Sequence, residues 1–272
     1  MSVIEKGFIV LGNDLAEIKI SLFGGNVVSY RPKSEEKDVF WVGDLNKFDN
    51  VQAIRGGIPV CWPRFSEEEL NVNLPRHGFA RLSMWNLDKA VVDAKLIDVE
   101  LSLIPDEKYN LDVFAKLYVK ITDEFECCLE TINNGDKEFK FSEALHSYFY
   151  VGDRDQVKIK GFDGYKYKNL ADGKECVLRG DIVINEEFDS AFMNHISRAE
   201  IEDVVLNRKI IMEKEGSKST VVWNPNKDLA EMSKGQYKNF VCVEAANQGE
   251  CFVVVKPNEV HKMSMTVKVE KL

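Results

Sequence analysis

The chain has 272 residues, of which 44% are hydrophobic and 30% charged, and this composition is typical of a folded globular protein and argues against disorder. The formal net charge is −9, so we expect no binding to nucleic acid through bulk charge, and an anionic ligand would need a local cluster of cations. All-β domains of this size commonly form one unit, which predicts a single domain over residues 1–272.

The N-terminal residues do not have the pattern of a signal peptide. Their short apolar runs are interrupted by Glu5, Asp14 and Glu17, and no run in the chain approaches the roughly 18 apolar residues of a membrane span. The six cysteines form no C-x-x-C pair, which disfavours a zinc or redox motif. We therefore expect a cytoplasmic protein with reduced thiols and no membrane partner; the oligomeric state is left open.

The predicted elements are strands, taken here in chain order. Residues 17–24 and 95–104 are the first two, and residues 114–122 follow with a clear period of two. In this third segment Ala115, Leu117, Val119 and Ile121 share one face. Residues 124–132 alternate in the same way, which predicts a long hairpin, and the turn at 133–136 leads to a strand over 138–152 that is interrupted near its centre.

The second half of the chain continues the pattern. Further strands are predicted at residues 157–162, 209–216, 219–225, 239–248, 250–257 and 262–272, and residues 228–240 allow only a short helical turn or two. No alternation of strands and helices occurs, which disfavours a parallel doubly wound sheet. The predicted fold is therefore all-β, a large antiparallel β-sandwich.

Nucleotide and metal motifs are missing from the sequence. The glycines of RGGIPV at 55–60 match no phosphate-binding loop, so Gly56 and Gly57 are expected to serve a turn or a close backbone approach. The four histidines have neither H-x-x-x-H nor H-E-x-x-H spacing. We therefore expect no metal and no cofactor.

Two polar residues occupy positions where a strand would otherwise be apolar. His146 lies in the aromatic segment ALHSYFYV, where an inward polar side chain needs a partner or a function. In the strand 239–248, Glu244 shares a face with Cys242 and Ala246, while the alternate residues point the other way. A surface glutamate on a solvent face and a carboxylate below a bound ligand both fit this pattern.

The stretch from Arg55 to Arg81 gathers cations into a segment rich in turn residues. Arg55, Arg76, His77 and Arg81 lie among Gly, Pro and Trp residues, in loops of the kind where binding residues concentrate. Three ordinary surface charges are the simpler interpretation of these arginines. Guanidinium groups, however, match phosphate oxygens with paired donors, which favours an anion-binding loop.

Several stretches together resemble the aldose 1-epimerase-like superfamily, and specifically its hexose-6-phosphate mutarotase branch. They are RGGIPVCWPRFS, LPRHGFAR, ALHSYFYVGD, the FDSAF stretch at Asp189, VVWNP and YKNFVCVEAAN, in that order from about residue 55 to 247. The resemblance implies a galactose mutarotase-like supersandwich and an enzyme that interconverts the α and β anomers of a hexose 6-phosphate, with a small sugar phosphate as its partner.

The resemblance also implies roles for individual residues. His146 matches the catalytic histidine of the family, Glu244 its catalytic glutamate, and Asp189 the carboxylate that binds sugar hydroxyls. Arg55 and Arg81 match arginines that contact the substrate, and His77 matches a second histidine near the sugar ring in the wider superfamily. Arg76 departs from the family pattern, in which an uncharged polar residue is expected. It could add a phosphate contact or change which sugar phosphate is favoured.

In the implied reaction an ionised Glu244 removes the proton of the anomeric hydroxyl and a protonated His146 delivers one to the ring oxygen. A carboxylate near the imidazole is expected to raise the pKa of His146 and so support this charge state. Three alternatives stay open on the sequence: a mutarotase for an unphosphorylated aldose, a non-catalytic carbohydrate-binding protein, and a structural β-sandwich.

Overall fold

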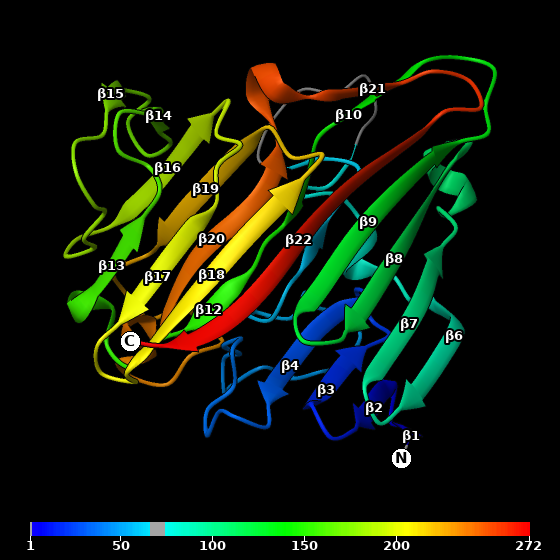
Figure 1. The fold of residues 1–272 in the computed structure, drawn as a ribbon. Helices are drawn as coiled ribbons and strands as arrows, with labels where there is room; N and C mark the ends of the chain where they lie inside the picture. The colour runs from blue at the N-terminus through cyan, green and yellow to red at the C-terminus, as the bar shows by residue number, and fades with distance from the viewer. Residues whose placement is uncertain (1, 66–73) are drawn as a thin grey trace.

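The computed structural model describes residues 2–65 and 74–272, so the central part of the stretch from Arg55 to Arg81, residues 66–73, lies outside the described residues. Two large antiparallel sheets carry most of the chain (Figure 1). The first sheet has the strand order β13 (Val157–Lys160), β17 (Ala199–Asp203), β18 (Arg208–Glu215), β22 (Val260–Lys271), β9 (Phe125–Asn133), β8 (Val113–Ile121), β7 (Leu96–Leu103), β6 (Asn86–Asp93).

The second large sheet holds the strands that will be seen to form the site. Its order is β15 (Glu175–Val177), β14 (Lys166–Asn169), β16 (Phe188–Met193), β19 (Ser219–Asn224), β20 (Phe240–Asn247), β11 (Glu143–Leu145), β5 (Val60–Cys61), with β12 (Tyr148–Tyr150) also paired to β20. Strand β20 is thus central, and the chain crosses repeatedly between the two large sheets.

Two smaller sheets complete the architecture. One is a meander of β1 (Ser2–Glu5), β2 (Phe8–Gly12), β3 (Ala16–Ser21) and β4 (Asn26–Pro32), and the other pairs β10 (Phe139–Phe141) with β21 (Val253–Val255). The helical segments of the described chain are single 3-10 turns: Ala80–Leu82, Glu107–Tyr109, Arg154–Gln156, Gln236–Asn239 and Gly249–Cys251. None of the described helices is long and apolar enough to cross a membrane.

The predicted all-β fold is confirmed, and the period of two explains it. Along β8 every odd residue from Val113 to Ile121 is buried and its even neighbours are at least partly exposed, as the sequence predicts. Strands β8 and β9 form the predicted hairpin. The prediction for 250–257 was too long, because Gly249–Cys251 is a 3-10 turn and only Val253–Val255 is a strand. One domain over residues 1–272 stays a prediction.

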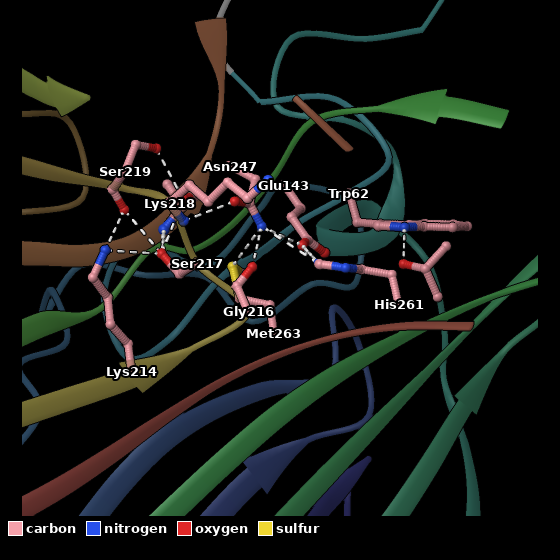
Figure 2. Close-up of polar contacts among 12 residues, drawn as sticks. Trp62, Glu143, Lys214, Gly216, Ser217, Lys218, Ser219, Asn247, His261 and Met263 are labelled. Carbon is pink, nitrogen blue, oxygen red and sulfur yellow. Dashed lines mark hydrogen bonds and ion pairs between the residues drawn. The ribbon is translucent and has the colours of Figure 1, made fainter. Parts of the chain in front are cut away.

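Polar side chains tie the two large sheets together at one end of the core (Figure 2). Glu143 of β11 lies 2.8 Å from Nε2 of His261 on β22, and the Asn247 amide donates to Glu143 Oε1 at 2.9 Å and to the Gly216 carbonyl at 2.9 Å. The indole of Trp62 donates to Thr131 Oγ1 at 2.9 Å. Glu143 is fully buried, so these bonds compensate part of the cost of removing its carboxylate from water.

Candidate active site

A cavity of about 600 Å³ lies on the face of the second large sheet that points away from the first. Strands of this sheet contribute part of its lining, and the described part of the stretch from Arg55 to Arg81 contributes another part. All seven residues that the sequence selected line it. The lining residues are Arg55, Phe65, Arg76, His77, Arg81, His146, Lys168, Leu170, Gly173, Asp189, Val221, Trp223, Leu229 and Glu244.

Strand register gathers the lining residues that come from these strands. Asp189 of β16 pairs with Trp223 of β19, and Val221 of β19 pairs with Glu244 of β20. Directly paired residues of antiparallel strands project from the same face of a sheet. The carboxylates of Asp189 and Glu244, which are 55 positions apart in the sequence, are therefore brought to one surface.

Glu244 is buried below this cavity, with only 1% of its surface exposed. Its alternate neighbours Val243 and Ala245 belong to the core between the large sheets, so the predicted division of β20 into two faces is confirmed. The interpretation of Glu244 as a surface residue is wrong. The small residues Cys242 and Ala246 on its own face leave room above the carboxylate.

His146 lies in the break between β11 and β12, where the sequence predicted an interrupted strand. The Ser147 amide bonds back to the Leu145 carbonyl at 2.8 Å, and the His146 amide donates to the Pro59 carbonyl at 3.1 Å. The imidazole stacks on Tyr148, with ring centroids 4.8 Å apart and an interplanar angle of 8°. The ring is thus fixed by both its backbone and its neighbour.

The imidazole of His146 and the carboxylate of Glu244 face each other. Nδ1 of His146 lies 3.2 Å from Oε1 of Glu244. This approach does not have hydrogen-bond geometry, and neither Nδ1 of His146 nor Oε2 of Glu244 has a hydrogen-bond partner among the described residues. Buried polar atoms are normally satisfied, so two such atoms on one cavity wall indicate a place for polar groups of a ligand.

The sequence led us to expect an ionised Glu244 and a protonated His146, and the surroundings of the pair favour a different charge state. Burial raises the pKa of Glu244 well above its usual range, and the negative charge of Asp189 adds to the effect. Burial lowers the pKa of His146 well below its usual range, and His77, Arg55 and Arg81 lower it further. The neutral acid and the neutral imidazole are therefore favoured without ligand, because burial outweighs the attraction between the charged forms.

The loop that carries Arg55 follows a path that only glycine allows. Gly56 and Gly57 have φ of +113° and +72°, and a Cβ on either would lie 2.4 Å from a backbone oxygen. The predicted close backbone approach at these glycines is confirmed. Arg55 then reaches the cavity, where its Nη1 donates to Tyr148 Oη at 3.1 Å and its Nε lies 3.4 Å from Glu231 Oε2.

Three further cations share the cavity. Arg81 Nη2 donates to the Arg76 carbonyl at 3.0 Å, and the buried Nε of Arg81 has no hydrogen-bond partner in the described part of the chain. Lys168 of β14 is the third. The cavity is lined by four cationic side chains and by the two carboxyl groups of Asp189 and Glu244, so its lining is positive although the whole chain is acidic. The arginines are therefore not scattered surface charges.

His77 and Asp189 complete the group of titratable side chains. His77 has the left-handed φ of +63°, and its ring lies 6.1 Å from that of His146. Burial and the nearby arginines lower the pKa of His77 to about 3, which keeps this imidazole neutral. Burial raises the pKa of Asp189 to about 6, although Arg76 opposes the shift.

The residues of the site that were not selected from the sequence include Trp223, Tyr148 and Lys168. The ring of Trp223 lies perpendicular to the His146 ring at a centroid distance of 5.9 Å, and Tyr148 stacks on the same imidazole at 4.8 Å. Both lie in stretches that carried the resemblance, so their position beside selected residues was an available signal. Lys168 lies in a short strand whose side chains are all at least partly exposed, and nothing in the sequence distinguishes it there.

One group of side chains has the chemistry of a metal site. His146, Cys242 and Glu244 offer three ligand atoms that all lie within 4.8 Å of one another. Imidazole, thiolate and carboxylate are ligands that zinc accepts. Arg55 and Arg81 act on the same space, however, and their positive charges oppose a further cation.

The fold and the cavity define the class of this protein: an antiparallel β-supersandwich with a buried carboxylate and an imidazole exposed to a cationic, sugar-sized cavity. The family model described as Aldose 1-epimerase matches residues 8–268. The chain belongs to this family. The resemblance found in the sequence is thereby confirmed.

Individual relatives agree with this assignment. A protein of Escherichia coli K12 named "Putative glucose-6-phosphate 1-epimerase" is 32% identical over 278 residues, which cover 98% of this chain and 92% of the relative. The crystal structure of a protein from Salmonella typhimurium described as a "putative mutarotase" superposes with a TM-score of 0.90 at 29% identity, over 100% of this chain and 93% of that one. A galactose mutarotase-like protein from Clostridium acetobutylicum has the same fold, with a TM-score of 0.77 at 19% identity, over 100% of this chain and 98% of that one.

Proposed function

We propose that the protein interconverts the α and β anomers of a hexose 6-phosphate, with glucose 6-phosphate as the first candidate, and that it does so in the cytoplasm. The observation that carries the proposal is the approach of His146 Nδ1 to Glu244 Oε1, at 3.2 Å, on the wall of a cavity that arginines line. Ring opening of a sugar needs one group to accept a proton and one to donate a proton. The name of the Escherichia coli relative supports the same substrate.

The arginines supply the phosphate site in this proposal. Arg55 and Arg81 both line the cavity and both act on His146 through their charge. A guanidinium can bind two phosphate oxygens at once, and Arg81 has a buried nitrogen without a partner. Binding the 6-phosphate holds the substrate at a point remote from C1, so that binding energy orients the reacting atoms.

The reaction conserves protons on the catalytic pair. Glu244 accepts the proton of the anomeric hydroxyl, His146 gives a proton to the ring oxygen, and the bond between C1 and that oxygen breaks to leave an open-chain aldehyde. Rotation about C1–C2 presents the other face of the carbonyl, and closure returns both protons. Asp189 and the neutral His77 bind ring hydroxyls, and Trp223 offers an aromatic surface to the sugar.

Substrate binding also supplies the charge state that the reaction needs. The pair holds one proton, which burial places on Glu244 in the unliganded cavity. The phosphate neutralises the arginines that lower the pKa of His146, and this favours the imidazolium and the carboxylate over the neutral pair. The bound complex then has the carboxylate base and the imidazolium acid.

Exchange spectroscopy by NMR tests the proposal. The exchange rate between the anomers of glucose 6-phosphate is measured with and without catalytic amounts of protein, and glucose and galactose serve as controls. Acceleration for the sugar phosphate above that for either free sugar is the expected result. Acceleration of a free sugar alone would keep the chemistry and refute the phosphate role of Arg55 and Arg81. Binding without acceleration of any sugar would indicate a carbohydrate-binding protein.

A further inference from the structure

Tyr148 connects the two halves of the proposed site. Its side chain is 1% exposed and projects from β12 between the arginine loop and the imidazole of His146. Its hydroxyl oxygen accepts a hydrogen bond from Arg55 Nη1 at 3.1 Å, and its ring stacks on His146 with a centroid distance of 4.8 Å. One side chain thus contacts both the group assigned to the phosphate and the group assigned to the sugar ring.

Other aromatic rings hold Tyr148 in this position. Phe240 lies 5.2 Å from it, Trp41 stacks on it at 5.9 Å, and Trp223 meets it edge-on at 6.0 Å. A ring enclosed in this way cannot change its rotamer without displacing its neighbours. The backbone is fixed as well, because the Tyr148 amide donates to the Gly57 carbonyl at 2.9 Å, two residues after Arg55.

Arg55 has only two side-chain contacts that orient its guanidinium in the described structure: Tyr148 Oη and, at the longer distance of 3.4 Å, Glu231 Oε2. The two contacts use the Nε donor and one donor of Nη1, so three of the five N–H donors of the guanidinium are not used by them. A flexible arginine would lose side-chain entropy on binding phosphate, and prior orientation removes part of that cost.

We propose that Tyr148 is a positioning residue that joins phosphate binding at Arg55 to the orientation of the His146 ring. Its hydroxyl orients the guanidinium for the 6-phosphate, and its ring fixes the plane of the imidazole relative to Glu244. The inference rests on the proposed phosphate role of Arg55. It assigns the two effects to different parts of one side chain, so they can be separated by substitution.

Tyr148→Phe removes the hydroxyl and keeps the stacked ring. The expected result is a KM for glucose 6-phosphate raised about tenfold, as for loss of one hydrogen bond to a charged group, with kcat within about twofold of wild type. Anomerisation of free glucose is unchanged. Tyr148→Leu also removes the stacked ring, and it lowers kcat for sugar phosphate and free sugar alike and shifts the pH profile of kcat.

Tyr118→Phe is the matched control. Tyr118 lies on β8 in the other large sheet, and its hydroxyl bonds to the charged Glu130 at 3.0 Å, so the same atom is removed from a comparable bond outside the cavity. Its kinetic constants stay at wild-type values. An unchanged KM for glucose 6-phosphate in Tyr148→Phe, or an equal loss for glucose and its phosphate, overturns the inference alone. Wild-type protein that accelerates no sugar phosphate overturns the proposed function and this inference with it.

Discussion

Replacing Glu244 by glutamine separates the requirements of catalysis from those of stability. The wild-type carboxylate is 1% exposed, its Oε2 lacks a partner, and its Oε1 approaches His146 without hydrogen-bond geometry. A buried polar group left unsatisfied costs about 1–3 kcal/mol. The glutamine amide is neutral and can donate to the neutral His146 Nδ1, so we expect Glu244→Gln to be more stable than wild type by about that amount, or about 2–6 °C in Tm.

The stability gain of Glu244→Gln depends on pH, and the raised pKa of Glu244 determines whether it grows or shrinks as the pH rises. Because the folded-state pKa of Glu244 is raised, the carboxyl of the unfolded chain ionises first as the pH rises above about 4.3. The wild-type protein therefore loses stability relative to Glu244→Gln above this pH and not below it. Chemical denaturation at pH 4.0 and pH 8.0 measures the difference, which should be the hydrogen-bond gain alone at pH 4.0 and larger at pH 8.0.

The same variant should lose activity by about 10²–10⁴-fold, the usual contribution of a general acid or base. Glu143→Gln is the matched control, because Glu143 is also a buried glutamate beside a histidine but bonds to His261 and Asn247 at 2.8 and 2.9 Å. Glu143→Gln should be destabilised by about 1–3 kcal/mol and should keep the catalytic chemistry. A Glu244→Gln protein that is active, or less stable than wild type at pH 8.0, would refute the reasoning.

Three further predictions concern other charged residues that line the cavity. Arg55→Gln and Arg81→Gln should each raise the KM for glucose 6-phosphate by about 10–100-fold and leave that for free glucose unchanged, as steady-state kinetics with both substrates would show. Asp189→Asn should be more stable than wild type at pH 7.5 and not at pH 4. Burial raises the folded-state pKa of Asp189 to about 6, so the wild-type protein loses stability as the pH rises from 4 to 7.5 and the asparagine variant does not. Thermal unfolding at both pH values checks this. Arg76→Gln removes the positive charge that lowers the pKa of Asp189, so this pKa should rise. If Asp189 controls a change in kcat/KM near pH 6, the midpoint of that change should move to higher pH in the variant. A midpoint that stays in place would contradict the assignment to Asp189.

Alternation in the sequence predicted several strands that have one buried face. Strands β8 and β20 show why, since each divides its residues between the core and another environment. Strands β2 and β17 also alternate between buried and more exposed residues but were not predicted. Strands β14 and β15 escaped prediction, because their side chains are partly or fully exposed on both faces. The interruption at 138–152 was predicted, but its distribution over β10 in one sheet and β11 and β12 in another depends on pairing with distant strands.

The residues of the candidate site were predictable for a similar reason, and their contacts were not. His146 and Glu244 stood out because each places a polar group where a strand should be apolar. Their approach to Arg55 depends on bonds of the Arg55 loop to β12 and to the segment before it, from the Tyr148 amide to Gly57 and from the His146 amide to Pro59. Those bonds join residues 91 and 87 positions apart, and no local pattern encodes them.

The charge state of His146 and Glu244 was not predictable from the sequence. Proximity of a carboxylate predicts a raised histidine pKa, and that expectation was wrong for the unliganded protein because desolvation is the larger effect on both His146 and Glu244. Desolvation depends on how completely the sheet and the arginine loop enclose the two groups. The loop arginines that oppose a charged His146 are also the groups assigned to the phosphate, so a substrate that neutralises them would promote the charge state needed for its own ring opening. A free hexose brings no such charge, and the proposed preference for a phosphorylated sugar therefore follows from proton placement as well as from binding.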